Sequence, residues 1–487
     1  MSIKKSGSLY ATCKVVAKAI HNGELNLALQ LIHDLVERII TEPLCTGHVY
    51  GSKELDDLCQ TIGECNLSGN CPRHPERREG SPADGTVFVY IVTKVQKSGG
   101  HSRVIERFIT ARPEAKHLIL ATGLNGKSDF ACRLSELSKI TDVILETAPS
   151  GNFQQKLTWL QKRLIEIQPE QTYLFNDHQD SIAIAAIQPS MGLNASFYHH
   201  ADHHLCLGVF SSHLHEHIDI HPMGYHHCRE TLGVKNRYLP LTIDDKGMRS
   251  TNVPFKQNDY LTTCTAARAN KIESPYYISY LAVIPLLLQS TGGKHVHIGR
   301  LTPWALFKLR RSLKKHGIAS DRFVYTPWVP SVWTALHDFN VDLYITSFPY
   351  GGGLTLIEAM GAGVPVALHR HIYSRVLSGI DLAYPEAFIW QDPDALIEYC
   401  CTVTADELLK HGEIARRQYE NFYDRDIFDG LINQKIDSLE PGQLPEYPQK
   451  SDEWACWMEN QPTLSKLIMR TAYRSYRRIR RRLARSH

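Results

Sequence analysis

The most informative segment of this chain reads Ser347-Phe-Pro-Tyr-Gly-Gly-Gly-Leu-Thr-Leu-Ile-Glu-Ala-Met-Gly-Ala-Gly-Val-Pro-Val366. It joins the end of a predicted strand to three glycines, then to a helix that carries Glu358, then to another strand. Glycines permit a sharp turn with uncovered backbone N–H groups, and the positive end of the following helix favours a phosphate. Glu358 could accept hydrogen bonds from the hydroxyls of a sugar or ribose. The segment thus indicates a nucleotide-sugar site, although an ordinary glycine turn explains a lone glycine run equally well.

The composition is that of a soluble globular protein with two or three domains. The chain has 487 residues, of which 43% are hydrophobic and 22% are charged. Its first residues show no apolar core of a signal peptide, and the longest apolar run, 276–288, is too short to span a bilayer. The twelve cysteines lie scattered in apolar segments, as expected of reduced thiols. We therefore predict a cytoplasmic protein.

The spacing of the cysteines predicts no metal site. Cys59, Cys65 and Cys71 recur every six residues near His48 and His74, but this pattern matches no standard zinc motif. No metal ion and no resident cofactor are expected.

The basic residues gather at the end of the chain. Between Arg470 and His487 there are eight arginines and no acidic residue, and without them the formal charge of +3 becomes −5. Arg470–Arg485 would suit an anionic membrane surface or an acidic partner, which makes a peripheral location on the inner face of the membrane an alternative to the cytoplasm. The alternative is a solvated tail that binds neither a membrane nor a partner. Nucleic acid is not expected, because the body carries no matching basic stripe.

Helical apolar spacing at 9–20 and 25–36 predicts a helical appendage, which a linker rich in Pro, Gly and Arg follows. From Thr86 onward, apolar strands alternate with helices in two successive series, which predicts two parallel sheets covered on both faces. Such domains bind ligands in a cleft at the carboxyl ends of their strands. We therefore expect an α/β chain with a helical appendage and linker (1–80), two Rossmann-like doubly wound domains facing a cleft (81–257 and 258–440), and a C-terminal helix with a basic tail (441–487).

The predicted strands of the first domain are 87–92, 117–121, 142–146, 172–175 and 195–198, with helices at about 101–112, 130–139, 153–167 and 179–187. Those of the second domain are 260–264, 294–298, 322–325, 343–346, 365–368 and 387–390. The stretch from about 205 to 257 is less regular, and we expect it to hold the end of the first sheet and the crossover.

Two further strand-to-helix loops carry residues suited to a phosphorylated ligand. In the first domain, Gly99 and Gly100 would let the backbone approach a ligand, and His101 could face the cleft. In the second domain, Arg268 and Lys271 could meet a diphosphate, because fixed cations stabilise a leaving diphosphate without a metal. Simple turns and solvated cations explain each loop equally well when it is taken alone.

Taken together, these motifs resemble those of the GT-B glycosyltransferases. The resemblance covers about residues 86–440 and rests on Gly-Gly-x-x-Arg at 99–103, Arg-x-x-Lys at 268–271 and Pro-Tyr-x-Gly-Gly-x-Thr-x-x-Glu-Ala at 349–359. The last motif is similar to the O-linked N-acetylglucosamine transferase family, and Gly-Ala-Gly-Val-Pro-Val at 361–366 is similar to the large retaining family, group 1. The resemblance implies transfer of a hexosyl or N-acetylhexosaminyl group from a nucleotide sugar, expected to be UDP-linked, to a glycan or protein acceptor.

The resemblance also implies a donor site on the second domain and an acceptor site on the first. Lys271 and Arg268 would bind the pyrophosphate, Glu358 would bind the ribose, and no metal would be needed. Gly99 and Gly100 would approach the donor from the first domain. Backbone and hydroxyl groups would hold the phosphates at four positions: Gly352, Gly353, Leu354 and Thr355.

Two features leave the stereochemistry of transfer open. The retaining family often carries a second glutamate where this chain has Tyr350. The inverting family has tyrosine there, but it also has a long helical repeat array that this chain lacks. If transfer inverts, a general base is needed.

A histidine-rich segment, 199–227, follows the last predicted strand of the first domain. Many GT-B enzymes have a histidine after such a strand that reaches the donor sugar, and His199 or His200 resembles it in position. The candidates for a general base are therefore His199, His200, Asp202 and His101. Structural histidines and a metal site of no defined spacing are the alternatives.

Two other functions stay open from the sequence. A nucleotide-sugar epimerase or hydrolase would use the same fold and the same donor site. A non-catalytic scaffold would instead bind partners through the helical appendage and the basic tail.

Overall fold

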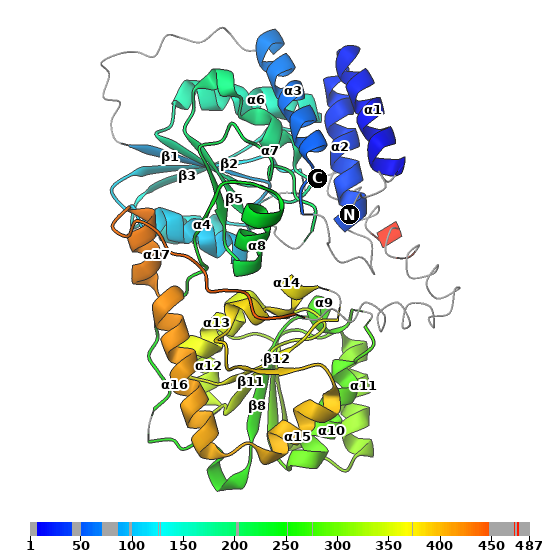
Figure 1. Cartoon of the computed structure of the whole chain (residues 1–487), viewed down its shortest axis with the longest axis vertical. Coiled ribbons are helices and arrows are strands. Elements are labelled where there is room, and N and C mark those ends of the chain that lie inside the picture. Colours follow the sequence, from blue (N-terminus) through cyan, green and yellow to red (C-terminus); the bar gives the residue numbers. More distant parts are fainter. Residues whose placement is uncertain are drawn as a thin grey trace.

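The computed structural model has two lobes, and each is built around one parallel sheet (Figure 1). It describes residues 7–40, 50–70, 86–96, 100–124, 126, 128–200, 204–250, 252–274, 276–372, 374–447, 472, 475 and 476. The arginines of the tail, together with His48, Cys71 and His74, lie outside the described residues.

The first sheet contains β1 (Val87–Val92), β2 (Lys116–Ala121), β3 (Asp142–Thr147), β4 (Gln171–Phe175), β5 (Ala195–His199), β6 (Glu216–Asp219) and β7 (Asn236–Tyr238). The second contains β8 (Thr262–Ala266), β9 (Lys294–Ile298), β10 (Phe323–Thr326), β11 (Leu343–Ile345), β12 (Val366–His369) and β13 (Phe388–Trp390). Every strand that the apolar runs predict is present. The sequence prediction lacks β6 and β7, because these short strands carry mostly polar residues.

The strand order is β3-β2-β1-β4-β5-β6-β7 in the first sheet and β10-β9-β8-β11-β12-β13 in the second. In both sheets the first strand lies inside, and the order reverses beside it, between β1 and β4 and between β8 and β11. This is the doubly wound, Rossmann-like arrangement, in which ligands bind where the order reverses. The predicted fold class is confirmed.

The helices of the N-terminal half are α1 (Gly7–His21), α2 (Leu25–Ile40), α3 (Lys53–Asn70), α4 (Gly100–Thr110), α5 (Ala131–Leu137), α6 (Phe153–Ile167), α7 (Ser181–Ala186) and α8 (Pro222–His226). Those of the C-terminal half are α9 (Ala269–Ile272), α10 (Tyr280–Thr291), α11 (Pro303–Lys315), α12 (Val332–Asp338), α13 (Gly353–Gly361), α14 (Arg375–Ser378), α15 (Pro393–Thr402), α16 (Ala405–Phe422) and α17 (Arg425–Ile432). Among the described residues, none of these helices is both long enough and apolar enough to cross a bilayer.

The central strand β1 shows how each sheet is covered on both faces. Val89 and Ile91 point into one core, with α6 and α7, whereas Tyr90 and Val92 point into the opposite core, with α4. All four side chains are fully buried, which explains the continuous apolar run. The alternation of side chains along the strand separates the two cores.

The N-terminal helices share the core of the first sheet. Apolar residues of α1, α2 and α3 belong to the same buried cluster as α6 and α7, and Figure 1 shows these helices beside the first lobe. Buried polar groups join them as well, since the carboxylate of Asp56 accepts hydrogen bonds from the N–H groups of Gly208 at 2.8 Å and Phe210 at 2.9 Å. The helical appendage is therefore an integral part of the first lobe.

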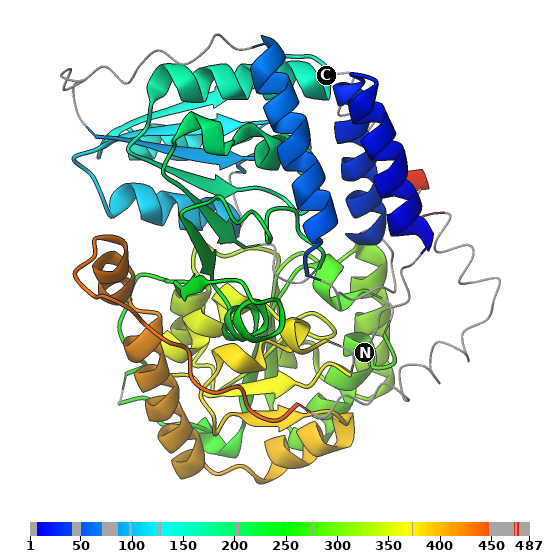
Figure 2. The same cartoon turned by 45° about the horizontal axis from the view of Figure 1, so that its top comes forward.

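The chain crosses back to the first lobe after the second sheet is complete. Phe428 and Leu431 of α17 lie in the core that covers β1 and α4. The following segment then returns to the second lobe, where the hydroxyl of Tyr447 lies 2.6 Å from that of Ser378 (Figure 2). The two lobes are thus joined by the crossover near 240 and by α16–α17 and the segment after it.

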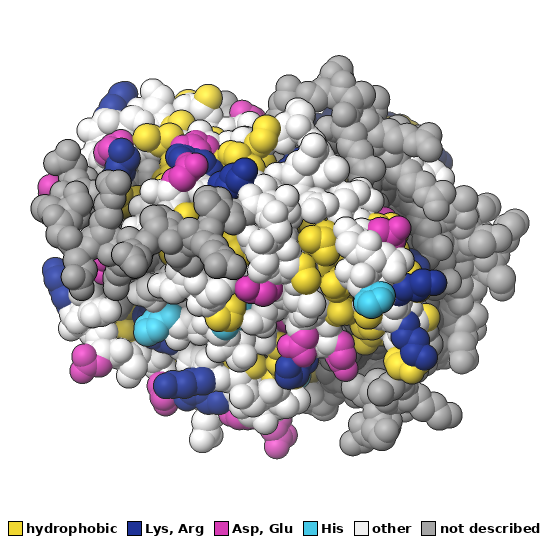
Figure 3. Space-filling model, turned by 90° about the horizontal axis from the view of Figure 1, so that it is seen from above, with side chains coloured by type: hydrophobic (Ala, Val, Ile, Leu, Met, Phe, Trp, Pro, Cys, Tyr) yellow, Lys and Arg dark blue, Asp and Glu magenta, His cyan; other side chains and the backbone are white. Residues whose placement is uncertain are grey.

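Charged side chains of both signs are scattered over the described part of the face of the molecule that Figure 3 shows. In the view of Figure 3, Lys and Arg side chains lie among Asp and Glu side chains. The described residues on this face therefore form no continuous basic surface.

Candidate functional site

Two loops of the second lobe meet where its strand order reverses. The connection after β8 contains the short helix α9, which carries Lys271, and the loop after the neighbouring strand β11 carries Tyr350 and Gly351. Lys271 Nζ donates a hydrogen bond to the carbonyl oxygen of Gly351 at 2.7 Å, and the N–H of Tyr350 donates to the carbonyl oxygen of Lys271 at 3.3 Å. The structure therefore brings Lys271 and the glycine segment together, as the resemblance implies.

Position 352 requires glycine because a larger side chain would clash with its neighbours, and not because of the backbone conformation. Gly352 has a φ of −120°, which any residue adopts. A Cβ atom there, however, would lie 2.6 Å from Thr355 Oγ1 and 3.2 Å from Lys271 Nζ. The glycine thus keeps open the space between the ammonium group and the start of α13.

The N-terminus of α13 is free to hold an anion. Gly352 is its N-cap, and no side chain caps the helix. The first N–H groups of an α-helix have no partner within the helix and carry its positive dipole end. Residues 351–355 are all half-buried. These amides and the Lys271 ammonium group form one electropositive site.

Burial lowers the pKa of Lys271 to about 8. Desolvation disfavours the charged form of Lys271. A phosphate placed beside the ammonium group would stabilise that charged form again. Arg268 is different, because it is exposed and forms the N-cap of the short helix α9. Lys271 is therefore the better placed of the two cations.

Thr355 is fixed by its neighbours. Its hydroxyl accepts a hydrogen bond from the Tyr344 hydroxyl at 2.9 Å and donates to the carbonyl oxygen of Gly352 at 3.2 Å. Tyr344 lies on β11, directly beneath the loop. The hydroxyl of Thr355 thus holds the first turn of α13 in shape.

Glu358 is buried, with 4% of its surface exposed. Desolvation raises its pKa, while the positive charge of Arg103 and hydrogen bonds from the N–H groups of Trp333 and Val332 act in the opposite direction. Its carboxylate therefore lies at the N-terminus of α12, with Arg103 of the first lobe nearby.

The start of α4 in the first lobe lies close to the start of α13 in the second. A Cβ atom on Gly100 would lie 3.0 Å from Leu354 Cδ1. Gly353 faces the crossover, since a Cβ atom there would lie 3.5 Å from Leu241 Cδ1. The residues that follow Gly100 on α4 are consequently close to the electropositive site.

His101 and His200 come together in the first lobe. Their rings stack with centroids 4.1 Å apart and an interplanar angle of 7°. Asp177 joins them, because one nitrogen of each ring and a carboxylate oxygen lie within 4.8 Å of one another. All three residues are half-buried and follow strands or begin a helix at the edge of the sheet where the order reverses. This arrangement can accept and hold a proton.

Burial lowers the pKa of His101 to about 4. Its ring is therefore neutral at physiological pH, which is the form that accepts a proton. Its Nε2 atom is buried and has no hydrogen-bond partner among the described residues.

His199 lies apart from this group. It ends β5, is 1% exposed, and contacts Asp219 of β6. Successive residues along a strand point to opposite faces, so His199 and His200 cannot serve the same site. The remaining two candidates, Gly99 and Asp202, lie outside the described residues.

Sequence reasoning missed Asp177. It follows β4, the strand beside β1, so its position after the predicted strand 172–175 could have indicated it. The carboxyl ends of neighbouring parallel strands meet at one edge of a sheet. Tyr344 was missed as well, because an apolar strand gives no sign that its hydroxyl reaches Thr355.

Comparison with known proteins relates the chain to solved structures, whereas no family model and no curated protein matches it. The apo form of the lipopolysaccharide outer core galactosyltransferase WaaB superposes with a TM-score of 0.53 at 17% identity, over 72% of this chain and 100% of that chain. Anabaena Alr3699/HepE in complex with UDP gives a TM-score of 0.54 at 12% identity, over 73% of this chain and 100% of that one. Its complex with UDP-glucose gives 0.52 at 13% identity, over 72% and 100%.

These likenesses span both lobes and agree with the strand orders of the two sheets. The chain therefore has the GT-B glycosyltransferase fold.

Proposed function

We propose that this chain is a glycosyltransferase that takes a sugar from a UDP-linked donor and transfers it to a glycan or protein acceptor, without a metal ion at the donor site. One observation carries the proposal. Lys271 and the uncapped N-terminus of α13 form an electropositive site where the strand order of the second sheet reverses.

The donor would lie against the second lobe. Its diphosphate gains negative charge as the glycosidic bond breaks, and a fixed cation with helix amides stabilises that charge as it develops. In this assignment Lys271 and the amides of residues 352–355 bind the diphosphate, Arg268 contributes from the rim, and Glu358 accepts hydrogen bonds from the ribose. The solved HepE complexes with UDP and UDP-glucose, which share the fold, support a uridine nucleotide.

The acceptor would lie against the first lobe. Its attacking hydroxyl must lose a proton during transfer, and His101, beside His200 and Asp177, can accept it. The contact between Gly100 and Leu354 brings this group toward the donor site. His101 is accordingly our choice for the general base if transfer inverts.

A binding screen tests the proposal first. UDP, GDP, UDP-glucose, UDP-N-acetylglucosamine and GDP-mannose are added to the full chain, and unfolding temperature and heat of binding are recorded. We expect UDP and one UDP-sugar to stabilise the chain, because a ligand that binds only the folded state raises its apparent stability. No stabilisation by any of them would contradict the proposal and favour a scaffold.

Donor turnover then separates the enzyme classes. The purified chain is incubated with the UDP-sugar that binds, without acceptor, and the products are separated by chromatography. A transferase leaves most of the donor intact until an acceptor is supplied, whereas an epimerase or hydrolase converts it rapidly. Added Mg²⁺ or Mn²⁺ should not raise the rate of transfer.

A further inference from the structure

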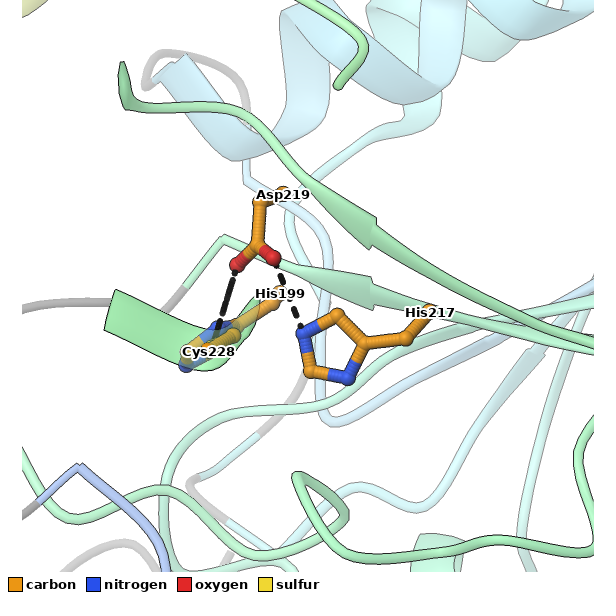
Figure 4. A group of neighbouring side chains, drawn as sticks. All are labelled: His199, His217, Asp219 and Cys228. Atoms are coloured by element: carbon orange, nitrogen blue, oxygen red, sulfur yellow. Dashed lines mark hydrogen bonds and ion pairs between the residues drawn. The ribbon is translucent and has the colours of Figure 1, made fainter. Parts of the chain in front are cut away.

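A second group of ligating side chains lies inside the first lobe, away from the proposed donor site. His199 ends β5, His217 and Asp219 lie on β6, and Cys228 lies in the π-helical turn η2 (His227–Thr231) that follows α8. Figure 4 shows the four side chains around Asp219, with His217 on one side and His199 and Cys228 on the other. The proposed function uses none of them.

The pairing of β5 with β6 creates this group. The register places His199 opposite Asp219 and Phe197 opposite His217. Residues two apart on a strand share a face, so His217 and Asp219 point the same way, toward η2. Short π-helical turns occur frequently at functional sites. The backbone thus brings four potential ligands from three elements to one point.

Several of the distances between the ligand atoms are close to those of a tetrahedral metal site. One ligand atom from each residue lies within 4.8 Å of the other three. Cys228 Sγ lies 3.8 Å from His199 Nδ1 and 3.6 Å from Asp219 Oδ1, and His217 Nε2 lies 3.3 Å from Asp219 Oδ2. Zn–S bonds of about 2.3 Å and Zn–N or Zn–O bonds of about 2.0–2.1 Å require separations of roughly 3.6 and 3.3 Å in a tetrahedron. The His199 Nδ1 to Asp219 Oδ1 pair is closer, at 2.9 Å.

Hydrogen bonding within the group does not satisfy all four side chains. His217 is 7% exposed, and its Nε2 atom lies 3.3 Å from Asp219 Oδ2, an oxygen that already accepts a hydrogen bond from Asn236 Nδ2 at 2.6 Å. His199 and Cys228 both direct their polar atoms at the same oxygen, Oδ1 of Asp219. Buried donors that share one acceptor are only partly satisfied, which is costly, and a metal ion at the centre would engage one atom of each residue.

The charges of the group balance those of a divalent cation. A thiolate from Cys228 and a carboxylate from Asp219, with two neutral imidazoles, neutralise one M²⁺ ion. The result is a site without net charge, which can be buried where none of the four residues is more than 7% exposed. Metal binding would displace the thiol proton to solvent.

The donor set selects the type of metal. Thiolate and imidazole ligands favour zinc and exclude calcium and magnesium, which take oxygen ligands. Four protein ligands leave no open position, which is typical of structural rather than catalytic zinc sites. Asn236 supports Asp219 from outside, because its Nδ2 atom donates to Asp219 Oδ2 at 2.6 Å and to the carbonyl oxygen of Tyr225 at 2.8 Å. Such outer partners orient metal-ligating carboxylates.

We propose that His199, His217, Asp219 and Cys228 hold a structural zinc ion that fastens the carboxyl ends of β5 and β6 to η2. The site would fix the strand end from which His200 emerges. It is independent of the proposed glycosyl transfer, which needs no metal at the donor.

Metal analysis of the untagged full-length chain, purified without chelators, tests this proposal. We expect about one equivalent of zinc per chain by inductively coupled plasma mass spectrometry. After removal of zinc with a chelator, the unfolding temperature should fall, and it should recover when zinc sulfate is added. Less than a tenth of an equivalent of any transition metal, with no uptake of added zinc, would overturn the proposal.

Variants and a spectroscopic probe identify the ligands. Cys228→Ser and His217→Ala should retain less than a tenth of the wild-type zinc. Cys206→Ser, which changes an equally buried cysteine of the same lobe outside the group, should retain all of it. If the first two variants fail to fold, cobalt substitution of the wild-type chain decides instead. A thiolate-to-cobalt charge-transfer band with intense tetrahedral d–d bands supports the site, and a spectrum of octahedral cobalt without that band contradicts it.

Discussion

The two sheets have the same arrangement at the point where their strand order reverses, but their loops carry opposite chemistry. In the first lobe that edge holds His101, His200 and Asp177, which can accept a proton. In the second lobe it holds Lys271 and the amides at the start of α13, which can bind an anion. The backbone topology therefore provides two equivalent positions, and the side chains give each a different chemical character.

This difference predicts that binding and transfer can be separated by mutation. Changes in the second lobe should weaken the donor complex, whereas changes in the first should slow transfer and leave donor binding unchanged.

Lys271→Met should reduce transfer by about 1,000-fold and weaken UDP binding by at least about 100-fold, because a fixed charge beside the leaving diphosphate is lost. Calorimetry with UDP and initial rates at saturating acceptor measure both effects. Lys308→Met, which removes an exposed lysine from α11, is the control and should change neither. Wild-type UDP affinity in a folded Lys271→Met variant would show that the diphosphate does not bind beside Lys271 in the second lobe.

His101→Asn should lower the rate of transfer by about 100-fold while the affinity for UDP stays within about twofold of wild type. General base catalysis contributes on the order of 10²–10⁴ in rate, and asparagine cannot take up the proton. His226→Asn, at a half-buried histidine outside this group, serves as the control. A rate unchanged in His101→Asn would show that another group accepts the proton.

Gly352→Ala should weaken UDP binding by about tenfold. The added methyl group would lie 2.6 Å from Thr355 Oγ1 and 3.2 Å from Lys271 Nζ, so it must displace one of them. In Gly69→Ala the same methyl group meets open space, and binding should not change. If Gly352→Ala binds UDP as tightly as wild type, the space beside Lys271 is not where the diphosphate lies.

The affinity for UDP should fall about tenfold between pH 7 and pH 9. The pKa of Lys271 is about 8 in the free chain, so this side chain is mostly charged at pH 7 and mostly neutral at pH 9. His101, with a pKa of about 4, stays neutral across this range and does not contribute. Calorimetric titrations at several pH values check this, and in Lys271→Met the pH dependence should disappear.

The fold could be predicted from the sequence almost completely, because the buried parallel strands are continuous apolar runs. For Val87–Val92 and Lys294–Ile298 the predicted bounds are those that the structure shows. The polar strands β6 and β7 could not be recognised in this way. Helix α3 was also missed, since most of its residues are polar and its packing against α7 depends on tertiary contacts.

The site could be predicted only in part, because chemistry between distant segments depends on strand order. The motifs indicated Lys271 and Gly352, and the structure places them together. They gave no sign that His199 turns toward Asp219 while the adjacent His200 stacks on His101. The direction of these two side chains depends on the alternation and register of β5, which no local pattern reveals.

A structure of the chain bound to UDP and an unreacted sugar analogue tests the central claim most directly. We predict that the diphosphate lies within hydrogen-bonding distance of Lys271 Nζ and of the first amides of α13, with the sugar directed toward His101. A diphosphate bound at the first sheet, beside Gly100 and His101, would reverse the roles of the two lobes. It would contradict the proposal that the second lobe binds the donor.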